Sequence, residues 1–140
     1  MPAKAVAEVM HPGVVTCRPT TSILEIVRLM NQHDISAVVV VDDHDRLAGI
    51  VTRNEMVAFY GYEEMWPHLQ ADQIMITQVA TALPDEPAFR AAQEMRRRRM
   101  QHVVVVEAND ATRRPRPVGV VSATDLVRDM EPARPQLTEE

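Results

Sequence analysis

A serine, a threonine and an aspartate stand close together near the end of the sequence, at Ser122, Thr124 and Asp125. The glycine and two valines before them, at residues 119–121, predict the end of a buried strand, and Ser122 predicts the N-cap of a following helix. A helix start offers free N–H groups and the positive end of the helix dipole, which favour an anion. A carboxylate beside it can accept hydrogen bonds from sugar hydroxyls. The pattern therefore predicts a corner that holds a ligand.

The same corner occurs earlier in the chain. Residues 49–51 are a glycine and two aliphatic residues, and Thr52, Arg53 and Glu55 follow them. An offset of 70 residues aligns Asp125 with Glu55, and an offset of 65 aligns the segments before the two corners, including Met75 with Met10. An internal repeat of this kind indicates two units that bury their apolar faces together.

Each repeat predicts the same series of elements around its corner. In the first repeat these are a helical turn (residues 6–10), a brief extended piece (14–16), a helix capped by Ser22, a strand (35–41), a tight turn (42–45), a second strand (46–51) and a helix opened by Thr52. The first strand is mostly valine, which predicts that both of its faces are covered. The closing helix is expected to turn Met56, Val57 and Phe59 inward. The predicted fold class is α/β, in the α+β sense, with two β-α-β-β-α units.

The repeat defines the predicted boundaries. We expect a first unit over residues 6–60, a connector over 61–70, a second unit over 71–129 and a flexible tail over 130–140. The second hairpin loop, over residues 107–117, is five residues longer than the first and carries arginines at 113, 114 and 116. Such a basic loop indicates either a solvated protrusion or a surface for docking a partner.

Composition narrows the classes of function. The chain has 140 residues, of which 46% are hydrophobic, and a formal net charge of −5, which disfavours nucleic acid as a partner. A single cysteine, Cys17, permits no internal disulfide, and no window is apolar enough for a membrane span or a signal peptide. We therefore expect a cytoplasmic protein that does not associate with a membrane.

The combined motifs resemble a tandem pair of cystathionine-β-synthase (CBS) domains. The resemblance rests on the short turns ending at Met10 and Met75, the capped amphipathic helices, the valine strands and the G-h-h-[ST]-x-x-[DE] pattern that closes each unit, where h is apolar. It covers residues 6–128. It implies a disc-shaped module of two units related by a pseudo-twofold axis, with up to two clefts that bind adenine-containing ligands such as AMP, ADP or ATP.

The resemblance also implies which residues bind. The aspartate of the closing pattern takes ribose hydroxyls, the serine or threonine lies by the phosphate, and the backbone before the first hairpin strand meets the base. Carried over by position, the second site is Thr81, Met100, Gln101, His102, Ser122, Thr124 and Asp125, and the first site is Thr16, Ile35, Ser36, Ala37, Thr52, Arg53 and Glu55. Glu55 departs from the pattern, because its extra methylene displaces the carboxylate, and it also fits a helix capping box with Thr52. We therefore expect one competent cleft, centred on Asp125.

Other candidate residues have simpler interpretations. The arginines at 96–99 indicate a solvated helix end, with phosphate or nucleic-acid contact as alternatives. His44 lies among Asp42, Asp43 and Asp45, and four adjacent residues in a tight turn cannot all converge on one metal ion, so we predict a hairpin turn and no metal site. No nucleophile elbow, phosphate-binding glycine loop or metal-binding helix is present, and we expect no catalytic residue.

Two functions remain open. The first is a stand-alone sensor that requires no cofactor, binds an adenosyl ligand between its units, forms a homodimer through the helices that follow each hairpin, and signals to an unknown effector protein. The second is a structural or protein-interaction module whose ligand clefts are degenerate.

Overall fold

A computed structural model describes residues 4–62, 64–107 and 114–132 of the chain. The predicted tail beyond residue 132 and the centre of the second hairpin loop lie outside these residues. In chain order the elements are α1 (Val6–Val9), β1 (His11–Pro12), β2 (Thr16–Cys17), α2 (Ile23–His33), β3 (Ala37–Val41), β4 (Leu47–Thr52), α3 (Arg53–Val57), η1 (Trp66–His68), α4 (Ala71–Ile74), β5 (Thr81–Ala82), α5 (Ala88–Arg98), β6 (His102–Val106), β7 (Pro117–Ser122) and α6 (Ala123–Met130).

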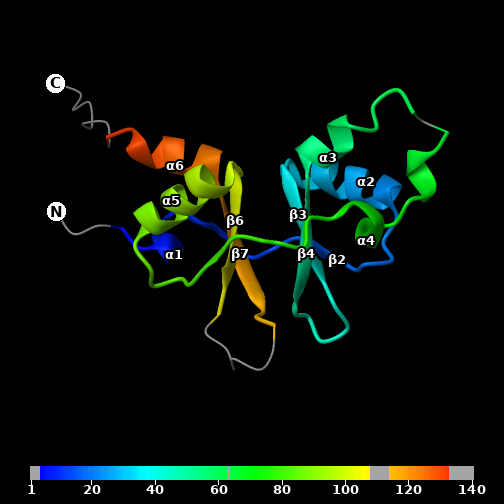
Figure 1. The fold of residues 1–140 in the computed structure, drawn as a ribbon. Helices are drawn as coiled ribbons and strands as arrows, with labels where there is room; N and C mark the ends of the chain where they lie inside the picture. Colours follow the sequence, from blue (N-terminus) through cyan, green and yellow to red (C-terminus); the bar gives the residue numbers. More distant parts are fainter. Residues whose placement is uncertain (1–3, 63, 108–113, 133–140) are drawn as a thin grey trace, which may run out of the picture.

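Two small sheets lie side by side at the centre of the molecule, and the helices cover their outer faces (Figure 1). One sheet has the strand order β2-β3-β4 and the other the order β1-β7-β6-β5. The predicted hairpins are both present, with β3 antiparallel to β4 and β6 antiparallel to β7. The prediction of a mixed α/β fold with two related units is confirmed.

The valine strands are buried on both faces, as predicted. Alternate side chains of β3 and β6 point outward into the separate cores beneath the helices, and the others point inward into a shared core between the sheets. The shared core includes Val39 and Val104, one from each unit, and both side chains are fully buried. This double burial accounts for the near-absence of polar residues in the two strands.

The predicted cap of the first long helix is also present. The Ser22 hydroxyl accepts a hydrogen bond from the Glu25 N–H at 3.2 Å, and α2 begins at the next residue. The helix ends at Asp34, which adopts a left-handed conformation with φ 51°. The matching helix α5 ends in the same way at Arg99, with φ 54°. Each left-handed residue turns the chain back toward the strand that follows.

The short first helix of each repeat packs on the other unit. Val6 of α1 is buried in the core beneath α5, and the Val6 N–H donates to the Glu86 carbonyl at 2.7 Å. Likewise Ala71 of α4 is buried in the core beneath α2, and its N–H donates to the Thr21 carbonyl at 2.8 Å. Each contiguous unit expected from the repeat therefore packs its first helix on the core of the other unit.

Two glycines make this exchange possible. A side chain at Gly119 would place its Cβ 2.7 Å from Met10 Sδ and 2.9 Å from the His11 carbonyl oxygen. A side chain at Gly49 would meet Met75 and the Ile76 carbonyl oxygen at 2.7 and 2.8 Å. The glycine of each closing pattern is thus required because the segment exchanged from the other repeat lies directly against it.

Three details differ from the expectations. Val57 does not point inward, and 70% of it is exposed, because α3 ends after five residues and Val57 lies beyond the turn that contacts the core. Met130, expected in the tail, is the last residue of α6. The connector holds a short 3-10 turn at η1.

None of the helices in the described parts of the chain is long and apolar enough to cross a membrane.

Candidate functional site

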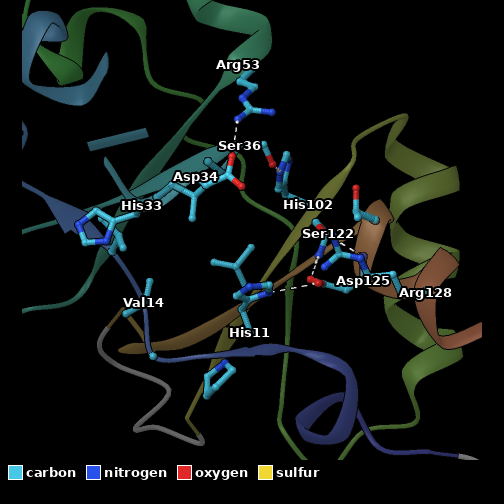
Figure 2. A pocket seen from close by; sticks show the side chains of 17 residues that line it. His11, Val14, His33, Asp34, Ser36, Arg53, His102, Ser122, Asp125 and Arg128 are labelled. Atoms are coloured by element: carbon cyan, nitrogen blue, oxygen red, sulfur yellow. Dashed lines mark hydrogen bonds and ion pairs between the residues drawn. The ribbon is translucent and has the colours of Figure 1, made fainter. Parts of the chain in front are cut away.

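A cleft of about 530 Å³ lies between the two units. Most of its lining comes from the linker after α1, the end of α2 with the start of β3, and the start of α6, and Arg53, His102 and Val120 complete it (Figure 2). The lining residues are His11, Pro12, Gly13, Val14, Val15, His33, Asp34, Ile35, Ser36, Ala37, Arg53, His102, Val120, Ser122, Thr124, Asp125 and Arg128.

Asp125 forms the acidic end of this cleft. Its Oδ2 accepts the Ser122 N–H at 2.8 Å, and its own N–H donates to Ser122 Oγ at 3.2 Å, which completes a capping box at the start of α6. Its Oδ1 lies 3.2 Å from Nδ1 of His11. The side chain is 8% exposed, so the helix start holds the carboxylate firmly in place with one edge toward the cleft.

The opposite wall belongs to the first unit. The Ser36 carbonyl accepts the Arg53 N–H at 3.0 Å, so the segment before β3 lies against the start of α3. The Arg53 guanidinium reaches back over this wall to Asp34, with 3.8 Å between the charged atoms. Figure 2 shows Arg53 and Asp34 facing the side of the cleft that carries Asp125.

His102 forms the floor between the two walls. It is 7% exposed, and its Nε2 lies 2.7 Å from Ser36 Oγ, a hydrogen bond that joins the two units. Burial lowers the pKa of His102, the charge of Asp125 opposes this effect, and the charge of Arg53 adds to it. The imidazole is therefore held neutral, and it is a hydrogen-bonding group rather than a cation.

The exposed side of the cleft carries positive charge. Within the described residues, the Arg128 guanidinium makes no ion pair, and it stands one helical turn beyond Asp125 (Figure 2). Together with Arg53 and the imidazole of His33, it surrounds the cleft with groups that bind anions. A ligand with hydroxyl groups at one end and a negative charge near the rim matches this arrangement.

The structure groups the predicted residues differently from the sequence repeat. It brings Ser122, Thr124, Asp125 and His102 of the second set together with Ile35, Ser36, Ala37 and Arg53 of the first. The other predicted residues, Thr81, Met100, Gln101, Thr16, Thr52 and Glu55, do not line this cleft. The reason is the face-to-face arrangement of the units, which sets the helix start of one unit opposite the strand start of the other. The cleft therefore draws its lining from both repeats, and the assignment of ligand-binding residues stays a prediction.

Two of the residues outside the cleft have clear roles elsewhere. Thr81 lies in β5 and lines a second hollow of about 600 Å³ with Arg90 and Arg97 of α5. Glu55 accepts both the Thr52 N–H at 2.6 Å and the Thr52 hydroxyl at 2.8 Å on its Oε1. The capping interpretation of Glu55 is thus confirmed.

Sequence reasoning missed several lining residues. Arg128 follows Asp125 by three residues on the same helix, and this spacing was a signal that places both on one face. His33 and Asp34 close α2 beside the predicted residue Ile35. His11 carried no signal, because it reaches the cleft only through the exchange of the first helices.

The remaining charged motifs are local structure. The Asp42 carboxylate accepts the N–H groups of His44 and Arg46 at 2.9 and 3.0 Å, which confirms the hairpin turn. Arg97 and Arg98 pair with Glu94 in the last turn of α5. Among the described residues, no three histidine, cysteine, aspartate or glutamate side chains gather as a metal site requires.

Comparison with known proteins agrees with this geometry. The sequence model of the CBS domain matches twice, over residues 6–61 and 71–131. The crystal structure of the CBS domain pair of protein MJ0100, in complex with 5′-methylthioadenosine and S-adenosyl-L-methionine, is similar with a TM-score of 0.79 and 28% identity, over 91% of this chain and 95% of that one. The CBS-domain protein ATU1752 from Agrobacterium tumefaciens gives a TM-score of 0.77 and 28% identity, over 90% and 92% of the two chains.

The curated relatives are larger proteins. L-aspartate semialdehyde sulfurtransferase of Methanocaldococcus jannaschii is 28% identical over 127 residues, which are 91% of this chain and 23% of that protein. The A-adding tRNA nucleotidyltransferase of Geobacter sulfurreducens is 30% identical over 131 residues, 92% of this chain and 14% of that one. This chain thus spans less than a quarter of the length of either relative. Two matches to the domain model and a shared two-unit fold place the chain in the CBS domain family, as a pair of CBS repeats.

Proposed function

We propose that this chain is a regulatory module that binds an adenosyl ligand in the cleft centred on Asp125. The observation that carries the proposal is the convergence of Asp125 and Ser122 from one unit with the strand start at Ile35 and Ser36 from the other. The CBS pair of protein MJ0100 was crystallised with two adenosyl compounds, which supports this class of ligand.

The charges of the cleft favour an adenine nucleotide over other adenosyl compounds. In the proposed pose, Asp125 accepts the ribose hydroxyls and the backbone at residues 35–37 meets the base. The phosphate then lies near Arg128 and Arg53, whose guanidinium groups form paired hydrogen bonds with phosphate oxygens. We therefore expect AMP, ADP or ATP to bind more tightly than S-adenosylmethionine, which carries a positive sulfonium where these arginines lie.

The mechanism is a coupling of binding to the relation between the units. A ligand that contacts both walls stabilises the arrangement in which they stand at the right separation, and it shifts the population toward that arrangement. An effector protein that distinguishes the two arrangements then reads the ligand concentration. No reaction is part of this proposal, and no cofactor is required for it.

The test is isothermal titration calorimetry with AMP, ADP, ATP and S-adenosylmethionine on the wild type, Asp125→Ala and Glu55→Ala. Both variants lose the carboxylate of a capping box, at a cost of about 1 kcal/mol in stability, so each controls for the other. We expect about one nucleotide per chain, with binding lost in Asp125→Ala and kept in Glu55→Ala.

The alternative function is a structural or protein-interaction module. Glu55 accepts hydrogen bonds from Thr52 as a helix cap, and this favours the alternative function on the first-unit side of the pair. Absence of heat with every ligand at millimolar concentration, from protein shown to be folded, would favour this alternative. Loss of binding in both variants would instead indicate two coupled sites.

We also propose that the module forms a homodimer through α3 and α6. Exposed apolar side chains occupy equivalent repeat positions, with Val57 of α3 and Val127 of α6 at 70% and 65% exposure and Tyr60, which follows α3, and Met130 of α6 at 86% and 78%. Burying them against a second copy gains hydrophobic free energy. Light scattering of the wild type and of the double variant Val57→Asp, Val127→Asp tests this proposal. A monomeric wild type at micromolar concentration would refute it.

We further expect a cytoplasmic location, where a reduced Cys17 is stable.

A further inference from the structure

His11 contacts the carboxylate oxygen of Asp125 that faces the cleft. Its Nδ1 lies 3.2 Å from Asp125 Oδ1, while the other carboxylate oxygen is bound to the Ser122 N–H at 2.8 Å (Figure 2). The carboxylate is only 8% exposed, so few directions of approach to it remain. A sugar hydroxyl that binds Oδ1 must therefore compete with the imidazole for the same oxygen.

The backbone of His11 is held in place, whereas its side chain is not. His11 pairs with Val120 as the first residue of β1, against the strand that leads into α6. Its side chain is 64% exposed, and among the described residues its one side-chain hydrogen bond is that to Asp125. The ring can thus rotate away from Asp125 into solvent while the sheet stays intact.

The second repeat has no equivalent of this contact. The residue aligned with His11 is Ile76, which pairs with Ile50 in the first-unit sheet. An isoleucine side chain offers no donor to the Glu55 carboxylate, which is bound to Thr52 instead. The histidine is therefore a feature of the Asp125 side alone.

Protonation strengthens the contact. A charged imidazole and a carboxylate form an ion pair, whereas a neutral imidazole forms a weaker hydrogen bond. The other charged groups around the hollow that adjoins His11 are Glu8, Asp129 and Arg128. The neutral His102 and the ion pair of Arg53 with Asp34 lie across the cleft from His11.

We propose that His11 competes with the ligand for Asp125, so that binding weakens when His11 is protonated. This inference rests on the proposed function, because it takes Asp125 as the ligand's anchor. Ligand binding then releases His11 into solvent, and acidification favours the empty module. The size of the effect is that of one partly exposed ion pair, roughly a two- to fivefold change in affinity.

The test compares the dissociation constant for AMP of the wild type with that of His11→Ala, near pH 6 and near pH 8. Taking the ratio of the two proteins at each pH cancels the titration of the AMP phosphate. We expect His11→Ala to bind AMP roughly two- to fivefold more tightly near pH 6 and about equally near pH 8. Glutamine cannot be protonated. The ratio of the AMP dissociation constants of His11→Gln and His11→Ala should therefore be the same at both pH values. His68→Ala removes a histidine outside the cleft and should match the wild type at both.

The possible outcomes separate this inference from the proposed function. If AMP binds the wild type, and His11→Ala binds equally tightly or more weakly near pH 6, His11 does not compete, and only this inference is overturned. If AMP, ADP, ATP and S-adenosylmethionine all fail to bind either protein, although both unfold cooperatively on heating, the proposed function falls and this inference falls with it. Tighter binding by His11→Ala near pH 6 alone supports the inference.

Discussion

Ser36 Oγ lies 2.7 Å from Nε2 of His102, and this hydrogen bond joins the first unit to the second at the floor of the cleft. The imidazole is 7% exposed, so most of its surface is shielded from water. The bond therefore links the stability of the two-unit arrangement to the surface that contacts the proposed ligand.

Ser36→Ala should destabilise the protein by about 1–3 kcal/mol. The substitution leaves Nε2 of a buried imidazole without a partner, and the cost of its desolvation is then not compensated. Urea unfolding followed by circular dichroism measures the change. Thr20→Ala removes a hydroxyl from an exposed loop position and should change the free energy of unfolding by less than about 0.5 kcal/mol. Equal effects of the two variants would contradict the role given to Ser36.

The stability of the protein should decrease in mild acid because of His102. Burial lowers the pKa of this histidine in the folded state, so at a pH just below its ordinary value of 6.5 the unfolded chain binds a proton that the folded chain does not. The contribution of the neutral imidazole is complete above about pH 6.5 and is lost progressively below it. Urea midpoints measured at intervals from pH 7.5 to pH 5 should fall, and the fall should be smaller in His102→Gln. An unchanged slope in this variant would assign the effect to other groups.

Gly119→Ala should weaken the docking of the N-terminal segment on the second unit. The added Cβ would lie 2.9 Å from the His11 carbonyl oxygen, which is backbone and cannot move without disturbing β1. Such overpacking costs about 1–3 kcal/mol, measured by chemical denaturation. Gly49→Ala should have a similar effect through the Ile76 carbonyl. If Gly119→Ala is as stable as the wild type, the close approach of the two segments is refuted.

Cys17 should be unreactive in the folded protein. Burial raises the pKa of its thiol to about 11, although a hydrogen bond with Thr21 opposes the shift. Near pH 8 only about one molecule in a thousand then carries the reactive thiolate. Mass spectrometry should detect no alkylation by iodoacetamide in native buffer and complete alkylation in concentrated urea. Rapid modification of the native protein would show that Cys17 is accessible.

The local elements could be predicted from the sequence because their causes are local. Ser22 and Glu25 define a helix start within four residues, and the valines of β3 and β6 indicate burial on both faces without knowledge of the partner strands. The capping boxes at Thr52 and Ser122 follow from spacing alone. These features depend only on neighbouring residues.

The composition of the cleft could not be predicted in the same way. A repeat gives both units equivalent surfaces, so an exchanged helix satisfies the same apolar pattern as a helix that packs on its own unit. The position of His11 beside Asp125 depends on that choice, whereas the grouping of Ile35 and Ser36 with Ser122 depends on how the two units face each other. Periodicity along the chain does not distinguish the two arrangements, which differ only in long-range contacts.

The exchange of α1 and α4 also bears on how such a chain can be divided. Cutting the chain within residues 61–70 would leave the first fragment with α1 but without the core on which α1 packs. The second fragment would likewise keep α4 but lack the core on which α4 packs. Each fragment would expose an apolar helix and lack the one that covers its core. Two fragments mixed together can supply each other's missing helix. The smallest complete unit of this architecture is therefore a pair.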